Sequence, residues 1–224
     1  MKGAVLVTGG AKRIGKAVCD ELRARGWTVL VHSREPANPL CADFADDPCA
    51  PWSLMDRAFA AAPDLCAVVN NASVFSLARE LPQAEEARLM RVNAEAPRHL
   101  AEILHDRLRR EGRRGAVVNL LDTRVLGASR EPLRTPYARS KAALHDATRE
   151  QARRLAPVLR VNGVAPGPVL LPADPACGEP GGAVLLDRRP APADVAQAVA
   201  FLLEAGSLTG QVLAVDAGQS LLRT

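Results

Sequence analysis

The stretch "YARSK" places Tyr137 and Lys141 four residues apart, a spacing that puts two side chains on one face of a helix. An ammonium group beside a phenol favours the phenolate, so we expect Lys141 to lower the pKa of Tyr137 toward neutral pH. A phenol with such a pKa suits general acid–base catalysis. The pair therefore predicts proton transfer, although a motif this short is common by chance and does not establish the reaction alone.

A glycine-rich turn near the N-terminus is the second feature with chemical meaning. The sequence "TGGAKRIG" at residues 8–15 follows an apolar run and precedes an amphipathic segment. A strand, a glycine turn and a helix in this order point backbone N–H groups and a helix N-terminus at a phosphate. Arg13 stands where such turns usually carry a third glycine. The alternative is a structural turn that binds no ligand.

The end of the second expected strand indicates which dinucleotide binds. NAD-binding folds place a carboxylate there to hold the ribose 2′-hydroxyl, whereas this chain reads "HSRE" at residues 32–35. Ser33 and Arg34 suit a 2′-phosphate, and we therefore predict NADPH as the cofactor. Glu35 leaves NADH as the alternative.

Short β-branched runs alternate with helical patterns, which predicts a parallel sheet with helices on both faces. We expect residues 1–224 to form one α/β domain with a doubly wound, Rossmann-type sheet of about seven strands. The expected strands are 4–7, 28–32, 40–42, 67–70, 116–120, 159–164 and 212–215, and the expected helices are 14–25, 52–61, 84–92, 94–110, 137–156 and 193–204. Residues 33–44 leave no room for a helix, so the second helix of the alternation is expected to be missing. Pro39 would then place the strand 40–42 at a sheet edge.

Composition excludes several classes of partner. The 224 residues are 48% hydrophobic and 24% charged, which is typical of a soluble globular protein. The net charge of +4 is carried mostly by arginine, and the basic cluster at 107–114 has no aromatic residues to stack on bases, so we expect no nucleic-acid partner. The five cysteines show no metal-ligand spacing, and no apolar run reaches the roughly 18 residues of a membrane helix. We predict a cytoplasmic protein with no metal and no membrane contact.

Together these motifs resemble the short-chain dehydrogenase/reductase family over nearly the whole chain. The shared stretches are "TGGAKRIG", "NNA" at 70–72, "RVNAEAP", "YARSK", "PG" at 166–167 and "GQVLAVDAG". The resemblance implies an oxidoreductase in which Tyr137 exchanges a proton, Lys141 binds the nicotinamide ribose and Asn93 supports a proton-relay water. It also implies a homotetramer built by the helices at 94–110 and 137–156. The candidate cofactor-binding residues are Gly9, Arg13, Ile14, Gly15, His32, Ser33, Arg34, Asp43, Asn71, Ala72, Lys141, Pro166 and Gly167.

One departure narrows the substrate. Most members carry a serine after the fifth strand that polarises a substrate carbonyl, but this chain reads "VVNLLDTR" and has Asp122 near that place. A carboxylate repels a developing oxyanion, so a ring with basic nitrogens suits this site better than an ordinary ketone does. Thr123 and Ser129 are alternative replacements for the serine. The Pro- and Gly-rich stretch at 172–182 predicts a mobile loop over the site.

Asp122, Arg13 and "NNASVF" closely resemble the pteridine reductase branch of the family. The resemblance implies that NADPH reduces a dihydropterin, or a related pterin or dihydrofolate, to its tetrahydro form. Asp122, Tyr137, Lys141 and Asn93 would be catalytic, and the substrate-binding residues would be Arg13, Ser73, Phe75, Asp122, Tyr137 and, from a neighbouring subunit, Arg223. The alternatives are a cofactor-only role for Arg13, a core position for Phe75 and a frayed tail at Arg223. For the whole chain, they are a general carbonyl reductase and a non-catalytic NADP(H) sensor, which would have little use for Tyr137 and Lys141.

Overall fold

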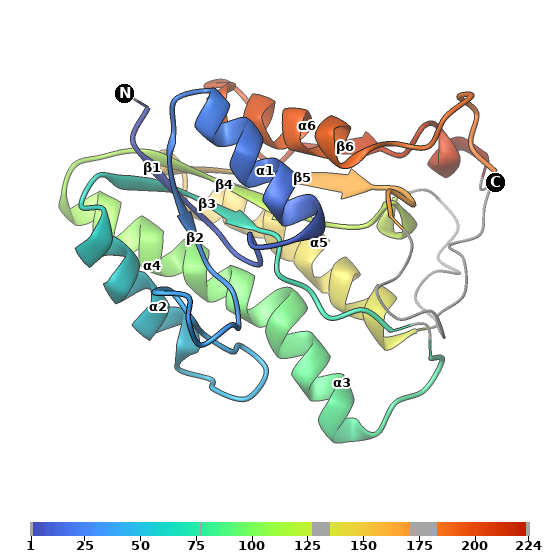
Figure 1. Cartoon of the computed structure of the whole chain (residues 1–224), viewed down its shortest axis with the longest axis horizontal. Coiled ribbons are helices and arrows are strands. Elements are labelled where there is room, and N and C mark those ends of the chain that lie inside the picture. Colours follow the sequence, from blue (N-terminus) through green and yellow to red (C-terminus); the bar gives the residue numbers. More distant parts are fainter. Residues whose placement is uncertain (1, 77, 127–134, 171–182, 223–224) are drawn as a thin grey trace.

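The computed structural model describes residues 2–76, 78–126, 135–170 and 183–222. Within these ranges one sheet of six strands has the order β2-β1-β3-β4-β5-β6, and every neighbouring pair is parallel (Figure 1). The doubly wound, Rossmann-type α/β fold is thereby confirmed. The strands are β1 (Ala4–Val7), β2 (Thr28–Val31), β3 (Leu65–Asn70), β4 (Gly115–Leu120), β5 (Leu159–Pro166) and β6 (Val212–Val215).

The strand expected at residues 40–42, which would be the seventh, does not form as a full strand. Only one bridge forms there, in which Ser33 pairs in parallel with Cys41. Pro39 lies just before this bridge and has no N–H for a ladder, which is consistent with its place at the sheet edge. No helix lies between β2 and Cys41, so the prediction of a missing helix is confirmed. The other expected elements are present, with ends that differ by at most two residues.

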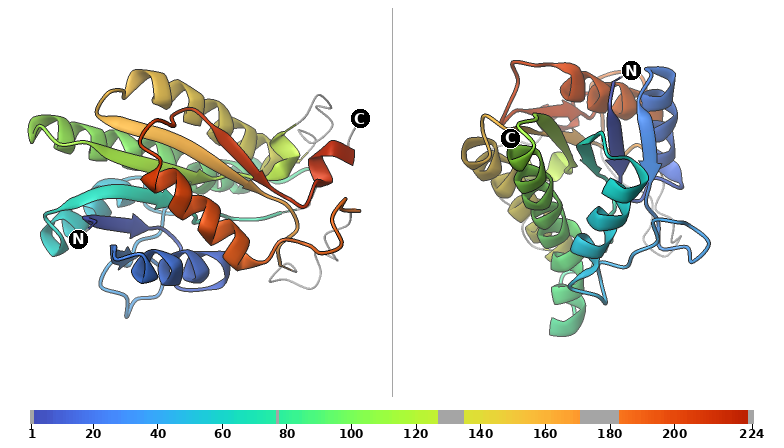
Figure 2. Two further views of the ribbon diagram at one scale, coloured as in Figure 1. Left: turned by 90° about the horizontal axis from the view of Figure 1, so that it is seen from above. Right: turned by 90° about the vertical axis from the view of Figure 1, so that its left-hand side faces the viewer.

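The helices form two layers that cover both faces of the sheet (Figures 1 and 2). They are α1 (Arg13–Ala24), α2 (Ala50–Ala61), α3 (Gln83–Met90), α4 (Ala96–Arg110), α5 (Pro136–Arg154) and α6 (Pro192–Glu204). The alternation of side chains along β1 shows this directly, because Val5 and Val7 join the core under α1 and α6, whereas Ala4 and Leu6 join the core under α2 and α4. All four residues are fully buried, as expected for a parallel strand with helices on both sides.

Three short helical segments complete the described structure. The π-helical turn η1 (Arg91–Glu95) joins α3 to α4, and such turns often occur at functional sites. The 3-10 turn η2 (Thr123–Val125) follows β4, and η5 (Gln219–Leu222) follows β6 near the C-terminal end. Both 3-10 turns therefore lie beyond the carboxyl ends of strands.

The strand order creates a crevice between β1 and β3. The chain passes from β1 outward to β2 and then returns to β3 on the other side of β1. At such a reversal the loops after the two central strands diverge, and ligands of open α/β sheets bind in the space between them. Here those loops are the glycine turn after Val7 and the segment that begins at Asn71, directly after β3.

None of the helices in the described ranges has the length and apolar character needed to cross a membrane. The same ranges contain no group of three or more histidine, cysteine or acidic side chains arranged to bind a metal ion.

Candidate active site

Hydrogen bonds join the glycine turn to the loop after β3. The Asn71 side-chain amide donates to the carbonyls of Thr8 and Gly9 at 2.9 and 3.0 Å, and the Thr8 hydroxyl oxygen accepts from the N–H groups of Asn71 and Ala72, each at 3.0 Å. A Cβ at Gly15 would lie 2.2 Å from the Gly9 carbonyl oxygen, so this close approach requires glycine. The turn is thus held in one shape before any ligand arrives.

The start of α1 presents the features of an anion site. Lys12, the N-cap residue, makes no side-chain cap, and the first turn holds no acidic residue, so its N–H groups and the positive helix end remain available to a phosphate. Arg13 begins the helix with φ of +55°, a region that favours glycine. The backbone therefore keeps the glycine-like conformation while the side chain is an arginine.

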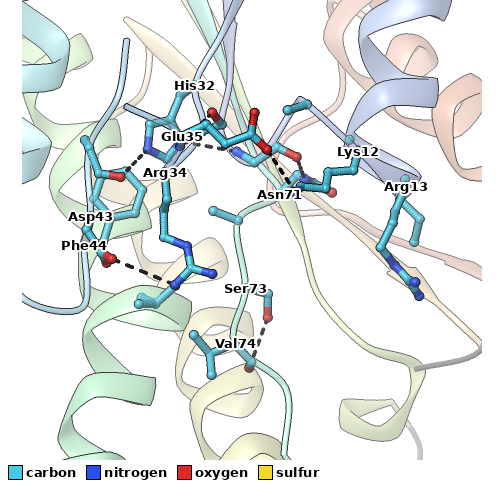
Figure 3. Close-up of a pocket in the computed structure, with 18 of the residues that line it drawn as sticks. Lys12, Arg13, His32, Arg34, Glu35, Asp43, Phe44, Asn71, Ser73 and Val74 are labelled. Carbon is cyan, nitrogen blue, oxygen red and sulfur yellow. Dashed lines mark hydrogen bonds and ion pairs between the residues drawn. The ribbon is translucent and has the colours of Figure 1, made fainter. Parts of the chain in front are cut away.

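A cavity of about 800 Å³ lies over this turn (Figure 3). Lys12 Nζ lies 2.9 Å from Glu35 Oε1, and Arg34 Nη1 lies 3.8 Å from Asp43 Oδ2. Figure 3 shows the Arg13 side chain on the opposite side of the cavity from Arg34, extending away from the Lys12 and Glu35 pair. The cationic side chains and the helix N-terminus fit the phosphates of a dinucleotide. The lining residues are Gly9, 11–15, 32–36, 42–44, 71–74 and Val92.

His32 lines the cavity, but its ring is engaged by the protein. Nδ1 accepts the Gly9 N–H at 3.2 Å, and Nε2 lies 3.0 Å from the Ala42 carbonyl oxygen, while the ring stacks on Phe44 with centroids 4.8 Å apart. Burial lowers the pKa of His32 to about 4, so the ring is neutral and Nε2–H donates to Ala42. His32 therefore stabilises the glycine turn through its hydrogen bond with the Gly9 N–H.

Asn93 lies in the π-helical turn and is fully buried. Its amide nitrogen donates to the Val74 carbonyl at 2.9 Å and to the Ser140 hydroxyl at 3.0 Å, and its oxygen accepts from the Ser73 hydroxyl and the Val74 N–H. These four bonds use the two donors and two lone pairs of the amide. Asn93 thus fixes residues 73–74 against α5, and this geometry does not support a proton-relay water on its side-chain amide.

The structure brings Tyr137, Asp122 and Lys141 together at the ends of β4 and α5. The Tyr137 hydroxyl donates to Asp122 Oδ2 at 3.0 Å, and Asp122 Oδ1 caps η2 by accepting the Arg124 N–H at 2.8 Å. Lys141 Nζ donates to the Leu120 carbonyl at 2.8 Å. Tyr137 and Lys141 are buried, so the three groups share one site of low solvent access.

The electrostatics of this group differ from the sequence-based expectation. Burial, followed by the Asp122 carboxylate, raises the pKa of Tyr137 well above its usual value, so the prediction that Lys141 lowers it is wrong. Burial lowers the pKa of Lys141 to about 8, although Asp122 opposes this shift. The phenol is therefore held as a proton donor, and the Lys141 ammonium is mostly charged at neutral pH but loses its proton at a lower pH than an ordinary lysine.

Two further side chains cover Tyr137. The Phe75 ring meets the Tyr137 ring edge to face, with centroids 4.8 Å apart, and remains 38% exposed, which excludes a simple core position. Sequence reasoning missed Arg124, whose guanidinium lies 5.7 Å from the Phe75 centroid and 4.0 Å from Asp122 Oδ1. Its place two residues after a capping aspartate was the available signal, but that pattern does not indicate where the side chain points.

The remaining candidates fall into four groups. The Thr123 hydroxyl donates to Asp216 at 2.7 Å, so it does not replace the family serine. Pro166 ends β5 and Gly167 follows it, and a Cβ at Gly167 would lie 2.9 Å from the Asp216 Cα. Ile14 packs partly buried beside α1's core face. Ser129, Arg223 and the predicted loop at 172–182 lie outside the described residues.

A Rossmann-type sheet, a glycine turn and a Tyr137–Lys141 pair beside it define a dinucleotide-binding oxidoreductase. Residues 9–220 match the family described as enoyl-(acyl carrier protein) reductase, and the chain belongs to the short-chain dehydrogenase/reductase family. Dihydromonapterin reductase of Citrobacter koseri is 30% identical over 97% of this chain and 96% of its own length. D-erythrulose reductase of Gallus gallus is 32% identical over 95% of this chain and 94% of its own length. The crystal structure of FolM alternative dihydrofolate reductase 1 from Brucella canis, complexed with NADP, matches this structure with a TM-score of 0.78. The two chains are 34% identical, and the match covers 98% of this chain and 94% of the Brucella chain.

Proposed function

We propose that this chain is an NADPH-dependent pteridine reductase, which reduces a dihydropterin or a related pterin or dihydrofolate to the tetrahydro form. One observation carries the proposal: Asp122 occupies the place of the family serine and accepts the Tyr137 hydroxyl at 3.0 Å. A carboxylate there disfavours the oxyanion of a reduced ketone but suits a basic ring nitrogen. The names of the Citrobacter and Brucella relatives support the same substrate class.

NADPH supplies the hydride when it is bound. The N–H groups at the start of α1 and the glycine turn would hold its pyrophosphate, and Lys141 would bind the nicotinamide ribose. Ser33 and Arg34 would hold the 2′-phosphate. The presence of NADP in the Brucella structure supports this choice of cofactor.

Tyr137 and Asp122 would move the proton. Reduction of a C=N bond adds a hydride to carbon and a proton to nitrogen. The phenol is kept protonated by burial and by the adjacent carboxylate, so a proton is available on this pair when the ring nitrogen becomes basic. Lys141, buried beneath them, would favour return of the proton from solvent by holding a positive charge nearby.

The substrate ring would lie between the nicotinamide and Phe75. Phe75 offers a partly exposed aromatic face, and stacking on such a face contributes roughly 0.5–1.5 kcal/mol beyond area burial. The planar guanidinium of Arg13 can donate to a phosphate oxygen and to a pterin carbonyl or ring nitrogen together. Ser73, held by Asn93, would contact the edge of the ring.

A second candidate is a reductase of sugar ketones, which the D-erythrulose reductase relative favours. Purified protein should oxidise NADPH with dihydrobiopterin, dihydromonapterin or dihydrofolate at a kcat/KM at least about a hundredfold above that with D-erythrulose and a ketone panel. Tyr137→Phe is the matched control and should lose the activity. Faster turnover of a ketone than of any pterin would contradict the assignment to pterins. No turnover of either class would favour the NADP(H) sensor.

We also propose that the protein is a cytoplasmic homotetramer assembled through α4 and α5, as the family resemblance implies. Light scattering at micromolar concentration should then give four times the mass of the 23.8 kDa chain. A monomer under these conditions would exclude the assembly and any contribution of Arg223 to a neighbouring site.

A further inference from the structure

Asp216 is a buried carboxylate that the proposed proton transfer does not use. Among the described residues, the buried side chains that carry a charge are Asp216, 5% exposed, and Lys141, 3% exposed. Lys141 has a role beside Tyr137, whereas Asp216 lies beyond the end of β6. Burying a carboxylate is costly unless hydrogen bonds replace the lost water. Its partners therefore indicate what the carboxylate does.

Three donors surround the Asp216 carboxylate. Oδ2 accepts the Thr123 hydroxyl at 2.7 Å and the Ser220 N–H at 2.8 Å, and Oδ1 accepts the Gly218 N–H at 2.9 Å. Burial opposes ionisation of Asp216, but hydrogen bonds from Thr123 and Ser220 outweigh it and lower its pKa below the usual value. The carboxylate is thus ionised and fully engaged.

These donors come from segments far apart in the sequence. Thr123 begins η2, directly after Asp122, whereas Gly218 directly precedes η5 and Ser220 lies within it. The turn before η5 also holds Ala217 at φ of +52°, and the Ala217 carbonyl accepts the N–H groups of residues 185 and 186. Asp216 therefore joins the carboxyl end of β6, the η2 turn after β4 and the C-terminal segment.

The η2 turn depends on such anchors because it spans only three residues. One helical turn does not hold itself, since most of its backbone groups lack helical partners. Among the described residues, the side-chain hydrogen bonds made to this turn are the Asp122 cap on Arg124 and the Thr123 bond to Asp216. The first uses Asp122 Oδ1, so the direction of Oδ2 toward the Tyr137 hydroxyl follows the placement of the whole turn.

We infer that Asp216 is a positioning residue for the Asp122 and Tyr137 pair, acting through the Thr123 hydroxyl, and that it couples the C-terminal turn at 216–222 to proton transfer. The kinetic part of this inference rests on the proposed function, because it treats the pair as the proton donor. The mechanical coupling between η2 and the C-terminal turn does not depend on the substrate.

Thr123→Val tests the coupling, because it removes the hydroxyl and nearly preserves the volume. Thr123→Ser retains the hydroxyl. Thr209→Val is a matched control, because it removes the acceptor of the Val161 N–H near the start of β5, away from the carboxyl ends of the strands. Hydrogen exchange without substrate should be faster in Thr123→Val across 122–126 and 216–222. Thr123→Ser should match the wild type there, and Thr209→Val should leave both segments unchanged.

The kinetic measurement separates positioning from general loss of structure. In Thr123→Val, kcat should fall by about ten- to a hundredfold, because misplaced catalytic groups cost rates of this order, while the Kd for NADPH stays within about threefold. The solvent isotope effect on kcat should rise, since proton transfer becomes slower than the other steps, and Thr123→Ser should restore it. Asp216→Asn should change the hydrogen-exchange rates and the solvent isotope effect in the same direction. It replaces Thr123→Val in both experiments if Thr123→Val does not fold.

Two outcomes would overturn the inference. One is wild-type exchange across 216–222 in a folded Thr123→Val or Asp216→Asn variant. The other is an unchanged kcat and isotope effect in a variant whose exchange has increased. If the wild type reduces no pterin, the proposed function fails, yet the exchange experiment still tests the coupling.

Discussion

Arg13 offers a test in which the backbone and the side chain have opposite effects. Its φ of +55° costs an L-residue roughly 1–2 kcal/mol relative to the right-handed region, and glycine avoids this cost. Glycine also raises the entropy of the unfolded chain, which offsets roughly 0.4–1 kcal/mol of that gain. We therefore expect Arg13→Gly to be about 0.5–1 kcal/mol more stable than Arg13→Ala, which retains the strained Cβ.

The two variants share the loss of the guanidinium, so their kinetics should agree. Both should keep NADPH affinity within about tenfold, because in the proposed binding mode the backbone groups of the glycine turn and of the start of α1 would hold the pyrophosphate. Both should raise the KM for the dihydropterin or lower kcat by at least about tenfold. Arg13→Gly should therefore be the more stable of two equally impaired variants, in line with strain retained at functional sites.

Urea unfolding without cofactor measures the stability difference, since bound NADPH would add its own stabilisation. A gain of about 1 kcal/mol corresponds to a Tm increase of roughly 2–4 °C for a chain of this size. If Arg13→Gly proved less stable than Arg13→Ala, the assignment of strain to this position would be wrong. If both variants lost NADPH binding and kept pterin kinetics at saturating cofactor, Arg13 would act only on the phosphate.

Three further outcomes are expected. Arg34→Ala should weaken NADPH about ten- to a hundredfold and NADH little, because a charge-assisted hydrogen bond to phosphate contributes roughly 1.5–3 kcal/mol; equal losses for both cofactors would contradict the 2′-phosphate role. Since the pKa of Lys141 is about 8, kcat/KM should fall as pH rises through that value, and Lys141→Arg should move the fall to higher pH; an unmoved limb would assign it to another group. His32 has a folded pKa of about 4 against 6.5 unfolded, so the unfolded chain binds the proton first and stability is lost as pH falls below 6.5, by about 2 kcal/mol near pH 5. His32→Asn should flatten the dependence of Tm on pH in this window, and an equally steep curve would refute the assignment.

The sequence predicts the elements and most of the site because both depend on local signals. The β-branched runs between helical patterns, the glycine turn and the polar residues after β1, β3 and β4 are visible in short windows, and a parallel sheet brings its carboxyl ends together. Pro39 likewise indicated an edge, and the structure reduces that strand to one bridge.

What escaped prediction depends on contacts between distant residues. The direction of the Tyr137 pKa follows from burial and from the Asp122 carboxylate, and spacing to Lys141 reveals neither. The bond from Thr123 to Asp216 joins positions 93 residues apart with no pattern between them. The π-helical turn around Asn93 has the residue types of an ordinary helix, so only the backbone shows it.

The chain contains a single tyrosine, and that residue is Tyr137. Because its ring touches Phe75 and its hydroxyl contacts Asp122, any tyrosine signal from the protein originates in the candidate active site. Protein grown with ring-labelled ¹³C-tyrosine would give one set of aromatic NMR resonances, with no assignment needed. Their shifts would report separately on ring stacking and on the state of the hydroxyl as each ligand is added. Tyr137 is therefore a spectroscopic probe of the site that requires no engineered substitution.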